Sequence, residues 1–485
     1  MKKRHPYTIF CFILVLGLLL TACGSANEPA TSEAEVAEPE VAEPEAEVEE
    51  PAATEKRKVV YFIGFGTGTA PDQVDGQNAL IEKFNASHPD IEVELMIVPH
   101  EEAHERFTSM VAGGNAPEVI GAAGFATIGI LSETGVIEDL TPYFDDFDMN
   151  LFYPDVQRLI ENFFPVGIPA MPFGIYPSVV FYNKDAFDAA GLDYPPNSYD
   201  DTSWTYDKVR EYGMLMTLDG AGNDATMDEF DPTDIVQWGF DDSWTDMRNY
   251  LAMWGAPGVG MVTETNEFKT AIVNQPEWVE GLQWLSDGIW VDHFIADAAG
   301  QAVAGSMGNG DPFSTGMSAM FLTHTWFMPE GLNGITFDYD MVPVPVSPSG
   351  DRIVRSDVDG FGIVNTADEK EAAFEFISWL VEPEQIVDVC LVYGCLPPVM
   401  AVEDEFRAIM EARWPGLDYD VIYNGFAYLD DPHSDAYVVQ GMRIGEILNN
   451  GLSLVYSGEE TDAKMILDSA NEDVQAVLDE YWADQ

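Results

Sequence analysis

The first part of the chain alternates between apolar runs of strand length and segments with helical periodicity. Val59–Ile63 is a continuous β-branched and aromatic run, which is typical of a buried strand. Gln73–Ser87 carries its apolar residues on one helical face, and Ile91–Val98 predicts the next strand. This order of strand, helix and strand predicts a parallel α/β sheet.

The pattern continues with a further helix and a further strand. His104–Val111 predicts the helix, and Glu118–Gly121 predicts a short strand that ends in a loop of small residues. Ligands of open α/β sheets bind at the carboxyl ends of the strands. We therefore expect Phe65–Thr67 and Ala123–Phe125, which follow two of these strands, to lie near a ligand.

The segment from Ile168 to Lys184 combines two kinds of sequence. Up to Pro177 it is rich in proline and glycine, and its prolines have no N–H group for a regular ladder. From Ser178 to Tyr182 it is a continuous apolar run, which predicts a buried strand. An irregular segment that leads into a buried strand is expected where a chain crosses between two lobes, so we predict two lobes hinged here.

The N-terminal 58 residues do not share this periodicity. A basic start at Lys2–Arg4 precedes an apolar run from Ile9 to Leu20, which predicts a secretory signal peptide because the run is too short to span a membrane. Residues 26–58 are rich in Ala-Glu-Pro, which predicts a disordered acidic tether. The remainder is longer than one core usually supports and predicts two domains.

The net charge narrows the choice of partners. The chain has 85 acidic and 21 basic residues and a formal net charge of −64. Such a surplus of acid argues against nucleic acid and anionic membrane surfaces as partners. A solvated acidic surface is the expected explanation, and a cationic ligand is the alternative.

Two cysteines remain in the body of the chain, Cys390 and Cys395. In an exported protein this spacing predicts a local disulfide that pins one loop. The pair has no neighbouring histidine or further cysteine, so it is a poor zinc site.

Motifs for enzyme chemistry are incomplete in this sequence. No Gly-x-Ser-x-Gly frame surrounds Ser306 or Ser318, and no Gly-Lys pair exists to form a phosphate-binding loop. We predict no catalytic residue and no cofactor. A pair of carboxylates for glycoside hydrolysis remains the alternative, since the acidic residues are so numerous.

Two segments contain residue types that are found in metal-binding motifs. His100-Glu101-Glu102-Ala103-His104 has zinc-ligand spacing, but His100 directly follows Pro99 and should lie before or at the first turn of a helix, whereas this motif normally lies in the middle of one. The loop 219–225 lacks the residue order of an EF-hand and predicts a surface loop, with calcium as the alternative. We therefore predict no bound metal.

Short motifs along nearly the whole body carry a resemblance to one family. In chain order they are Phe84-Asn85, Ser87-His88-Pro89-Asp90-Ile91, Gly113-Gly114-Asn115-Ala116-Pro117-Glu118-Val119, Gly135-Val136-Ile137-Glu138-Asp139-Leu140-Thr141-Pro142, Pro172-Phe173, Tyr182-Asn183-Lys184, Phe187, Ala190-Gly191-Leu192, Pro195-Pro196, Ser203-Trp204, Gly316, Ala319-Met320, Trp326 and Ala372-Ala373-Phe374-Glu375-Phe376. The chain resembles the carbohydrate-type extracellular solute-binding proteins, the maltose-binding kind that serve ABC importers. One departure is Glu118, where the family commonly has aspartate.

The resemblance implies the fold and the domain organisation. It implies a two-lobed periplasmic-binding-protein fold of α/β lobes with an interlobe cleft and hinge crossovers, the second crossover at Asp359–Ile363. The expected parts are a signal peptide at 1–22, a tether at 23–58, lobe one at 59–176 and 362–405, and lobe two at 177–361 and 406–485.

Leu20-Thr21-Ala22-Cys23 resembles a bacterial lipobox, in which Cys23 would be lipidated. A plain signal peptide with an incidental cysteine is the alternative. The implied protein is a monomer anchored by lipid on the extracytoplasmic face, where it would pass a carbohydrate to an ABC transporter permease. A solute of another class, such as a peptide or a polyamine, remains open on the same fold.

Sugar recognition needs flat aromatic rings for the apolar ring face and polar groups for the hydroxyls. The candidates for these roles are Phe65, Thr67, Phe125, Phe173, Tyr176, Asp242, Trp244, Trp254, Trp326, Asp359 and Phe361. The resemblance places a stacking aromatic near Trp326. Each aromatic has an alternative role as a core residue that anchors a loop.

Overall fold

The computed structural model describes residues 56–163, 167–242, 246–262, 268–305, 311–429 and 438–483. Its main sheet has the strand order β10-β4-β11-β3-β1-β2, with β9 paired to β4. The strands are β1 (Arg57–Ile63), β2 (Ile91–Ile97), β3 (Val119–Gly124), β4 (Met171–Asn183), β9 (Met320–His324), β10 (Tyr339–Val342) and β11 (Ser356–Ile363). Two short hairpins, β5 (Leu218–Asp219) with β6 (Ile235–Gln237) and β7 (Gly260–Val262) with β8 (Phe268–Ala271), lie outside it.

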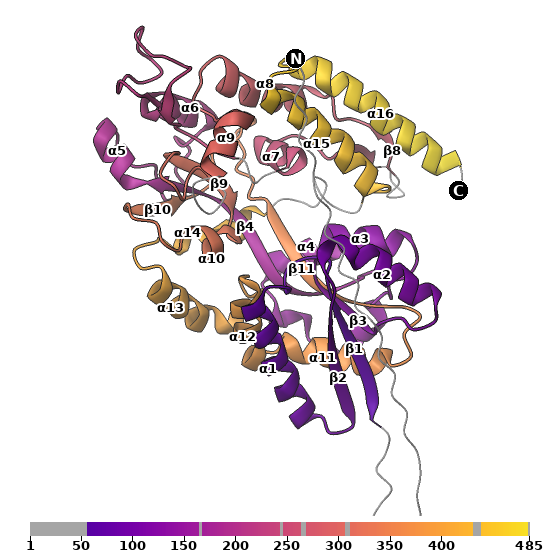
Figure 1. Cartoon of the computed structure of the whole chain (residues 1–485). Helices are drawn as coiled ribbons and strands as arrows, with labels where there is room; N and C mark the ends of the chain where they lie inside the picture. Colours follow the sequence, from indigo (N-terminus) through magenta and orange to yellow (C-terminus); the bar gives the residue numbers. More distant parts are fainter. Residues whose placement is uncertain are drawn as a thin grey trace, which may run out of the picture. The chain divides into compact units, whose positions relative to one another are not determined.

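Helices surround this sheet (Figure 1). In chain order they are α1 (Pro71–Ser87), α2 (His100–Ala112), α3 (Phe125–Glu133), α4 (Pro154–Phe163), α5 (Lys184–Ala190), α6 (Tyr206–Met216), α7 (Met247–Trp254), α8 (Pro276–Trp290), α9 (Ala298–Gly305), α10 (Phe327–Gly331), α11 (Lys370–Leu380), α12 (Pro383–Tyr393), α13 (Glu403–Arg413), α14 (Asp420–Gly425), α15 (Gly441–Ser457) and α16 (Ala463–Ala483). Among the residues that the structure describes, no helix has the length and apolarity needed to cross a bilayer.

The predicted parallel pairing is confirmed for β1, β2 and β3, while β4, β9, β10 and β11 pair in antiparallel fashion and make the sheet mixed. β1 pairs in parallel with β2 through the full register Arg57–Ile63 to Ile91–Ile97, and it also pairs in parallel with β3. The helix α1 packs on α12 and β2 and buries Leu80, Ile81 and Phe84. The apolar face read from the sequence is thus the face that covers the sheet.

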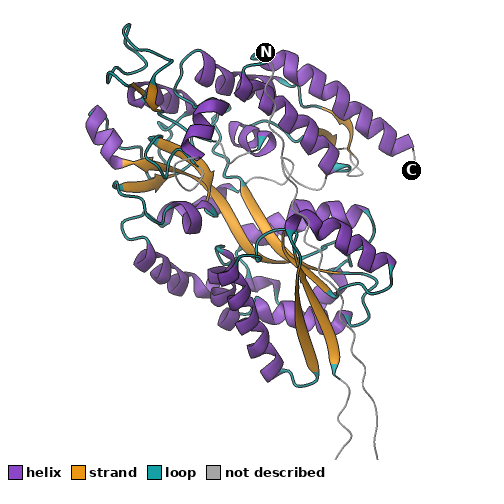
Figure 2. Ribbon diagram, viewed as in Figure 1, coloured by secondary structure: helices purple, strands orange, loops and turns teal. Residues whose placement is uncertain are grey.

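The strand β4 is longer and more regular than the sequence predicts. The expectation of an irregular segment up to Pro177 is wrong, because Met171–Asn183 is one strand and all of its residues are buried. Its first half pairs with β11, and from Ser178 onward it pairs with β9 and β10 (Figure 2). The prolines are tolerated because a proline keeps its carbonyl acceptor, as when the N–H of Thr325 donates to the carbonyl of Pro177 at 3.1 Å.

The fold is therefore two-lobed, and the strands β4 and β11 belong to both lobes. β11 is antiparallel to β4 over Ser356–Phe361 and to β3 over Asp359–Ile363. The expected second crossover at Asp359–Ile363 falls inside β11. The strand β10 lies at an edge of the sheet.

Phe181, in the second half of β4, provides a test of how much this strand contributes to stability. Its side chain is fully buried and lies near the rings of Phe313 and Phe327. Phe181→Ala should lower the free energy of unfolding by about 3–5 kcal/mol, because it removes buried apolar contacts and leaves a cavity. Urea denaturation measures this change.

Val236→Ala is the matched control, since Val236 is 51% exposed and should change stability by no more than about 0.5 kcal/mol. Equal effects of the two substitutions would contradict the central place of β4 in the core.

Candidate functional site

A cavity of about 660 Å³ lies where the two lobes meet. Its lining comes from the loop after β1, the start of α1, the start of α3, the strands β4 and β11, the α10 region, the end of α12 and the end of α13. The lining residues are Gly66, Thr67, Ala70, Asp72, Gln73, Gly124, Phe125, Ala126, Tyr176, Trp326, Pro329, Asn333, Arg355, Asp357, Val358, Asp359, Leu391, Val392, Tyr393, Gly394 and Arg413. The cavity thus includes the carboxyl ends of β1 and β3, where a ligand of an open α/β sheet is expected.

The loop after β1 is held in place by Gln73, in the first turn of α1. Its side-chain oxygen accepts the backbone N–H of Gly68 at 2.9 Å, and its amide nitrogen donates to the Thr67 hydroxyl at 2.6 Å. Gly66 must approach the carbonyl of Ala122 so closely that a Cβ atom there would lie 2.6 Å from the carbonyl oxygen. These contacts fix two polar side chains, Thr67 and Gln73, on the cavity wall.

Charged residues from β11 and the residue before it form another wall. Arg355 is 3% exposed, and its guanidinium donates to Asp357 Oδ1 at 3.0 Å and to Asn249 Oδ1 at 2.5 Å. Burial by itself would raise the pKa of Asp357, but the charges of Arg355 and of neighbouring basic groups outweigh it and lower this pKa. Asp357 is therefore ionised and already paired.

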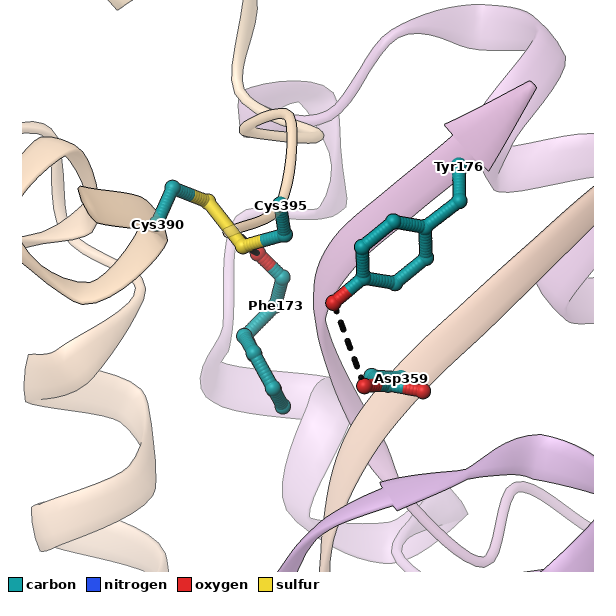
Figure 3. Close-up of a disulfide and its surroundings, with 5 residues drawn as sticks. All are labelled: Phe173, Tyr176, Asp359, Cys390 and Cys395. Atoms are coloured by element: carbon teal, nitrogen blue, oxygen red, sulfur yellow. Dashed lines mark hydrogen bonds between the residues drawn. A yellow bond between two sulfur atoms is a disulfide. The ribbon is translucent and has the colours of Figure 1, made fainter. Parts of the chain in front are cut away.

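Tyr176 and Asp359 face each other across the two crossover strands (Figure 3). The Tyr176 hydroxyl donates to Asp359 Oδ2 at 3.2 Å. Burial, followed by the nearby charge of Asp357, raises the pKa of Asp359 to about 7. Asp359 is thus protonated in part at neutral pH, when it can donate a hydrogen bond as well as accept one.

His324 connects the second-lobe strand β9 to this group. It is 1% exposed, and its Nδ1 atom lies 3.1 Å from both the Tyr176 carbonyl oxygen and the Ser178 hydroxyl oxygen. Its ring is nearly parallel to that of Trp326, at a centroid distance of 6.0 Å. Burial lowers the pKa of His324, so the ring is neutral and serves to position its neighbours.

Five of the sequence candidates line the cavity: Thr67, Phe125, Tyr176, Trp326 and Asp359. Three other aromatics, which do not line it, are buried in the core of the first lobe. Phe65 packs against Phe62 and Phe107, while Phe173 stacks on Phe361 with ring centroids 4.3 Å apart.

Two further candidates are buried in the second lobe, away from the cavity. Asp242 accepts the hydroxyl of Tyr456 at 2.6 Å, and burial raises its pKa to about 6. Trp254 packs against Tyr206 and Trp284 beside a separate, shallower cavity of about 790 Å³. Trp244 and Cys23 lie outside the described residues.

Sequence reasoning missed several lining residues, among them Gln73, Arg355, Asp357 and Tyr393, as well as His324 behind them. The alternation of Arg355, which directly precedes β11, with Asp357 and Asp359 within it was the available signal, because alternate residues share a face of a strand.

The two metal-like motifs have local structural roles. α2 begins at His100, whose Nδ1 atom lies 3.0 Å from the carbonyl oxygen of Gly64, so His100 lies in the first turn as predicted. Asp219 accepts the backbone N–H groups of Ala221, Asn223 and Asp231. Within the described ranges, no group of three or more His, Cys, Asp or Glu side chains is arranged to hold a metal ion.

Cys390 and Cys395 form a disulfide at the end of α12, next to the cavity (Figure 3).

The family model described as bacterial extracellular solute-binding protein matches residues 70–387. The sn-glycerol-3-phosphate-binding periplasmic protein UgpB of Pectobacterium atrosepticum is 24% identical over 429 residues, which is 83% of this chain and 87% of that protein.

Solved structures share the fold. The ABC substrate-binding protein Lmo0181 from Listeria monocytogenes, in complex with cycloalternan, has a TM-score of 0.68 at 20% identity and covers 87% of this chain and 99% of its own. UgpB from Mycobacterium tuberculosis, in complex with glycerophosphocholine, has a TM-score of 0.66 at 17% identity with the same coverage of 87% and 99%.

Asp359 makes stability depend on pH. Its pKa is raised from 3.8 to about 7, so the folded state holds a proton that the unfolded chain releases. This contribution is fully present below about pH 4 and is lost as the pH rises through about 7. Asp359→Asn should therefore flatten the fall of stability between pH 5 and 7, by at most about 1.4 kcal/mol per pH unit.

Thermal unfolding across this pH range measures the effect, with the exposed carboxylate of Asp228, changed to Asn, as control. Burial also raises the pKa of Glu133 to about 7. Glu133 is present in all three proteins, so its contribution to the pH dependence of stability cancels in the comparison. Identical pH profiles of wild type and Asp359→Asn would contradict this assignment.

Proposed function

The chain belongs to the bacterial extracellular solute-binding protein family, and we propose that it captures a neutral sugar or oligosaccharide in the cavity between its lobes for an ABC transporter permease. One observation carries this proposal most directly. The same cavity combines the half-buried ring of Trp326 with the carboxyl groups of Asp357 and Asp359. An aromatic face beside hydrogen-bonding carboxyl groups suits a sugar ring, which has an apolar face and a rim of hydroxyls.

The rest of the lining supports a polyhydroxylated ligand. Thr67, Gln73 and Asn333 add a hydroxyl and two amides, each of which can both donate and accept hydrogen bonds. The hydroxyl of Tyr176 is directed at Asp359, and the partly protonated carboxyl group there can serve as donor or acceptor. A ligand with many hydroxyls can satisfy such a wall without carrying a charge.

The charge balance argues for a neutral solute over a phosphorylated one. Three carboxyl groups line the cavity, from Asp72, Asp357 and Asp359, against the guanidinium groups of Arg355 and Arg413. Arg355 is already engaged by Asp357 and Asn249, and Arg413 is exposed over the ring of Trp414. In this cavity a phosphate group would be near more negatively charged carboxylates than available positively charged guanidinium groups, so its binding would be unfavourable. A peptide or a polyamine is the remaining alternative, and its binding would overturn the sugar assignment.

A solute that contacts lining residues of both lobes favours the closed arrangement, which a permease can then recognise. In this proposal the protein is a monomer without catalytic activity. It is exported and anchored through Cys23 at the extracytoplasmic face, and residues 23–56, which precede β1, serve as the tether. A single acyl chain gives only marginal anchoring, so the proposal requires the multiply acylated cysteine that the lipobox resemblance implies.

A thermal shift screen tests the solute class. A ligand at 100 times its dissociation constant should add about 2.7 kcal/mol of stability and raise the melting temperature. The panel contains maltose, mannotriose, glycerol 3-phosphate, spermidine and a mixed peptide pool, and we expect shifts with the sugars only. A shift with spermidine, the peptides or glycerol 3-phosphate and none with sugars would overturn the proposal. Release of reducing ends during incubation would instead indicate a glycoside hydrolase.

Trp326→Ala should remove the stacking surface. We expect sugar affinity to fall roughly thirtyfold, or about 2 kcal/mol, as for a central aromatic anchor. Isothermal titration calorimetry measures the loss.

The matched control is Trp482→Ala, which changes another half-buried tryptophan, on α16 and outside the cavity lining. The control should bind sugar as the wild type does. Unchanged affinity in Trp326→Ala would show that the Trp326 ring does not contact the bound sugar.

A further inference from the structure

The disulfide between Cys390 and Cys395 closes the last turn of α12, which ends at Tyr393, and this turn forms part of the cavity wall. Its Cα atoms are 4.6 Å apart, and the two residues are 1% and 2% exposed. All four residues between them, Leu391–Gly394, line the cavity. A covalent bond thus ties together the two ends of a continuous stretch of solute-facing wall.

On one side the turn is joined to the crossover strand β4. Leu396 and Ile175 exchange two backbone hydrogen bonds, at 3.1 and 3.2 Å. At Gly174 no side chain would fit, because a Cβ atom there would lie 2.6 Å from the Cβ atom and 2.8 Å from the Sγ atom of Cys395. Figure 3 shows the disulfide beside Phe173, Tyr176 and Asp359, so it packs directly against the strand that carries the site.

On its other sides the turn reaches both lobes. The Tyr393 hydroxyl lies 2.8 Å from the Tyr61 hydroxyl and 3.0 Å from Gln77 Oε1, in the first lobe. Gly394 has a φ of +73°, and a Cβ atom there would come within 2.9 Å of Pro329 Cγ, in α10. Trp326 immediately precedes α10, so the turn abuts the helix that follows the proposed stacking residue.

The turn also has hydrogen bonds of its own. The backbone N–H groups of Gly394 and Cys395 donate to the carbonyl of Cys390 at 2.8 and 3.1 Å. Breaking the S–S bond should therefore loosen this last turn of α12 while the rest of the helix stays folded. This separates a role in shaping the cavity from a role in holding the lobe together.

We propose that the Cys390–Cys395 disulfide is a positioning element of the solute site, which holds Leu391–Gly394 as a preformed wall between β4 and α10, so that its reduction weakens solute binding. The inference rests on the proposed function, since it concerns the same cavity. A wall that is ordered before binding costs less entropy when the solute arrives, and an opened turn would have to be ordered by the solute itself.

Reduction by a dithiol is a balanced exchange. One thiolate of the reductant attacks a sulfur of the pair and forms a mixed disulfide, and the second thiolate then displaces the protein sulfur. The reductant loses two electrons and two protons and becomes a disulfide, while Cys390 and Cys395 become two thiols. Because both sulfurs are buried, this exchange requires the turn to open first.

Two measurements on the full-length protein test the inference. Hydrogen–deuterium exchange is compared for the oxidised wild type, the wild type reduced with dithiothreitol, and the double variant Cys390→Ser with Cys395→Ser. We expect amide exchange over 391–396 to rise at least tenfold on reduction and equally in the double variant, with no further change when dithiothreitol is added to that variant. Unchanged exchange over this segment would overturn the proposal without reference to any ligand.

The second measurement is affinity for maltose and mannotriose by titration calorimetry. We expect the dissociation constant to rise about tenfold in the reduced and doubly substituted proteins. Leu448→Ala is the matched control, since Leu448 is buried in α15 and outside the cavity lining, so that variant should melt earlier yet bind as the wild type does.

Faster exchange with unchanged affinity would overturn the positioning role. A wild type that binds neither sugar would count against the proposed function, while the exchange measurement would still decide whether the disulfide holds the wall.

Discussion

The arrangement of the site depends on the point where β4 changes partners, at Ser178. The backbone N–H of Ser178 donates to the carbonyl of Arg355 at 2.7 Å, and its hydroxyl donates to the same oxygen at 2.8 Å. His324 then reaches the Ser178 hydroxyl from β9. Three strands therefore meet at one serine, and the side chains just before it on β4 and just after Arg355 on β11 point into the cavity.

The chemistry of the cavity follows from this constraint. Tyr176 and Asp359 come from different crossover strands. Tyr176 lies directly opposite Asp357, and its long side chain reaches the diagonal neighbour Asp359 to form their hydrogen bond. The charges of the buried Arg355 and the partly exposed Asp357 neutralise each other in the same wall. The result is a surface rich in hydrogen-bonding groups with little uncompensated positive charge, which suits hydroxyl groups better than phosphate.

Much of this could be predicted from sequence, for reasons that are local. The runs at β1 and β2 and the apolar face of α1 are set by residues close in the chain, and they were predicted to within a few residues. The Pro- and Gly-rich half of β4 was not, because its regularity depends on β11, which lies about 180 residues later. Phe173 and Tyr176 are both aromatic residues of the same Pro- and Gly-rich segment, but Tyr176 lines the cavity and Phe173 packs in the core. This difference cannot be read from the segment itself, because it depends on which side chain the neighbouring strand and the last turn of α12 cover. His324 and Asp357 could not be assigned to the site from the sequence, because they reach it only through the pairing of β9 and β11 with β4.

The central claim is that this junction holds a cavity for a neutral polyhydroxylated solute. Native mass spectrometry of the protein isolated gently from its own cells tests it directly, because the bound solute is then chosen by the protein rather than by the experimenter. The account predicts one equivalent of bound mass that corresponds to a sugar or an oligosaccharide and is absent after unfolding. A bound mass that corresponds to a phosphate ester, a polyamine or a peptide would contradict it.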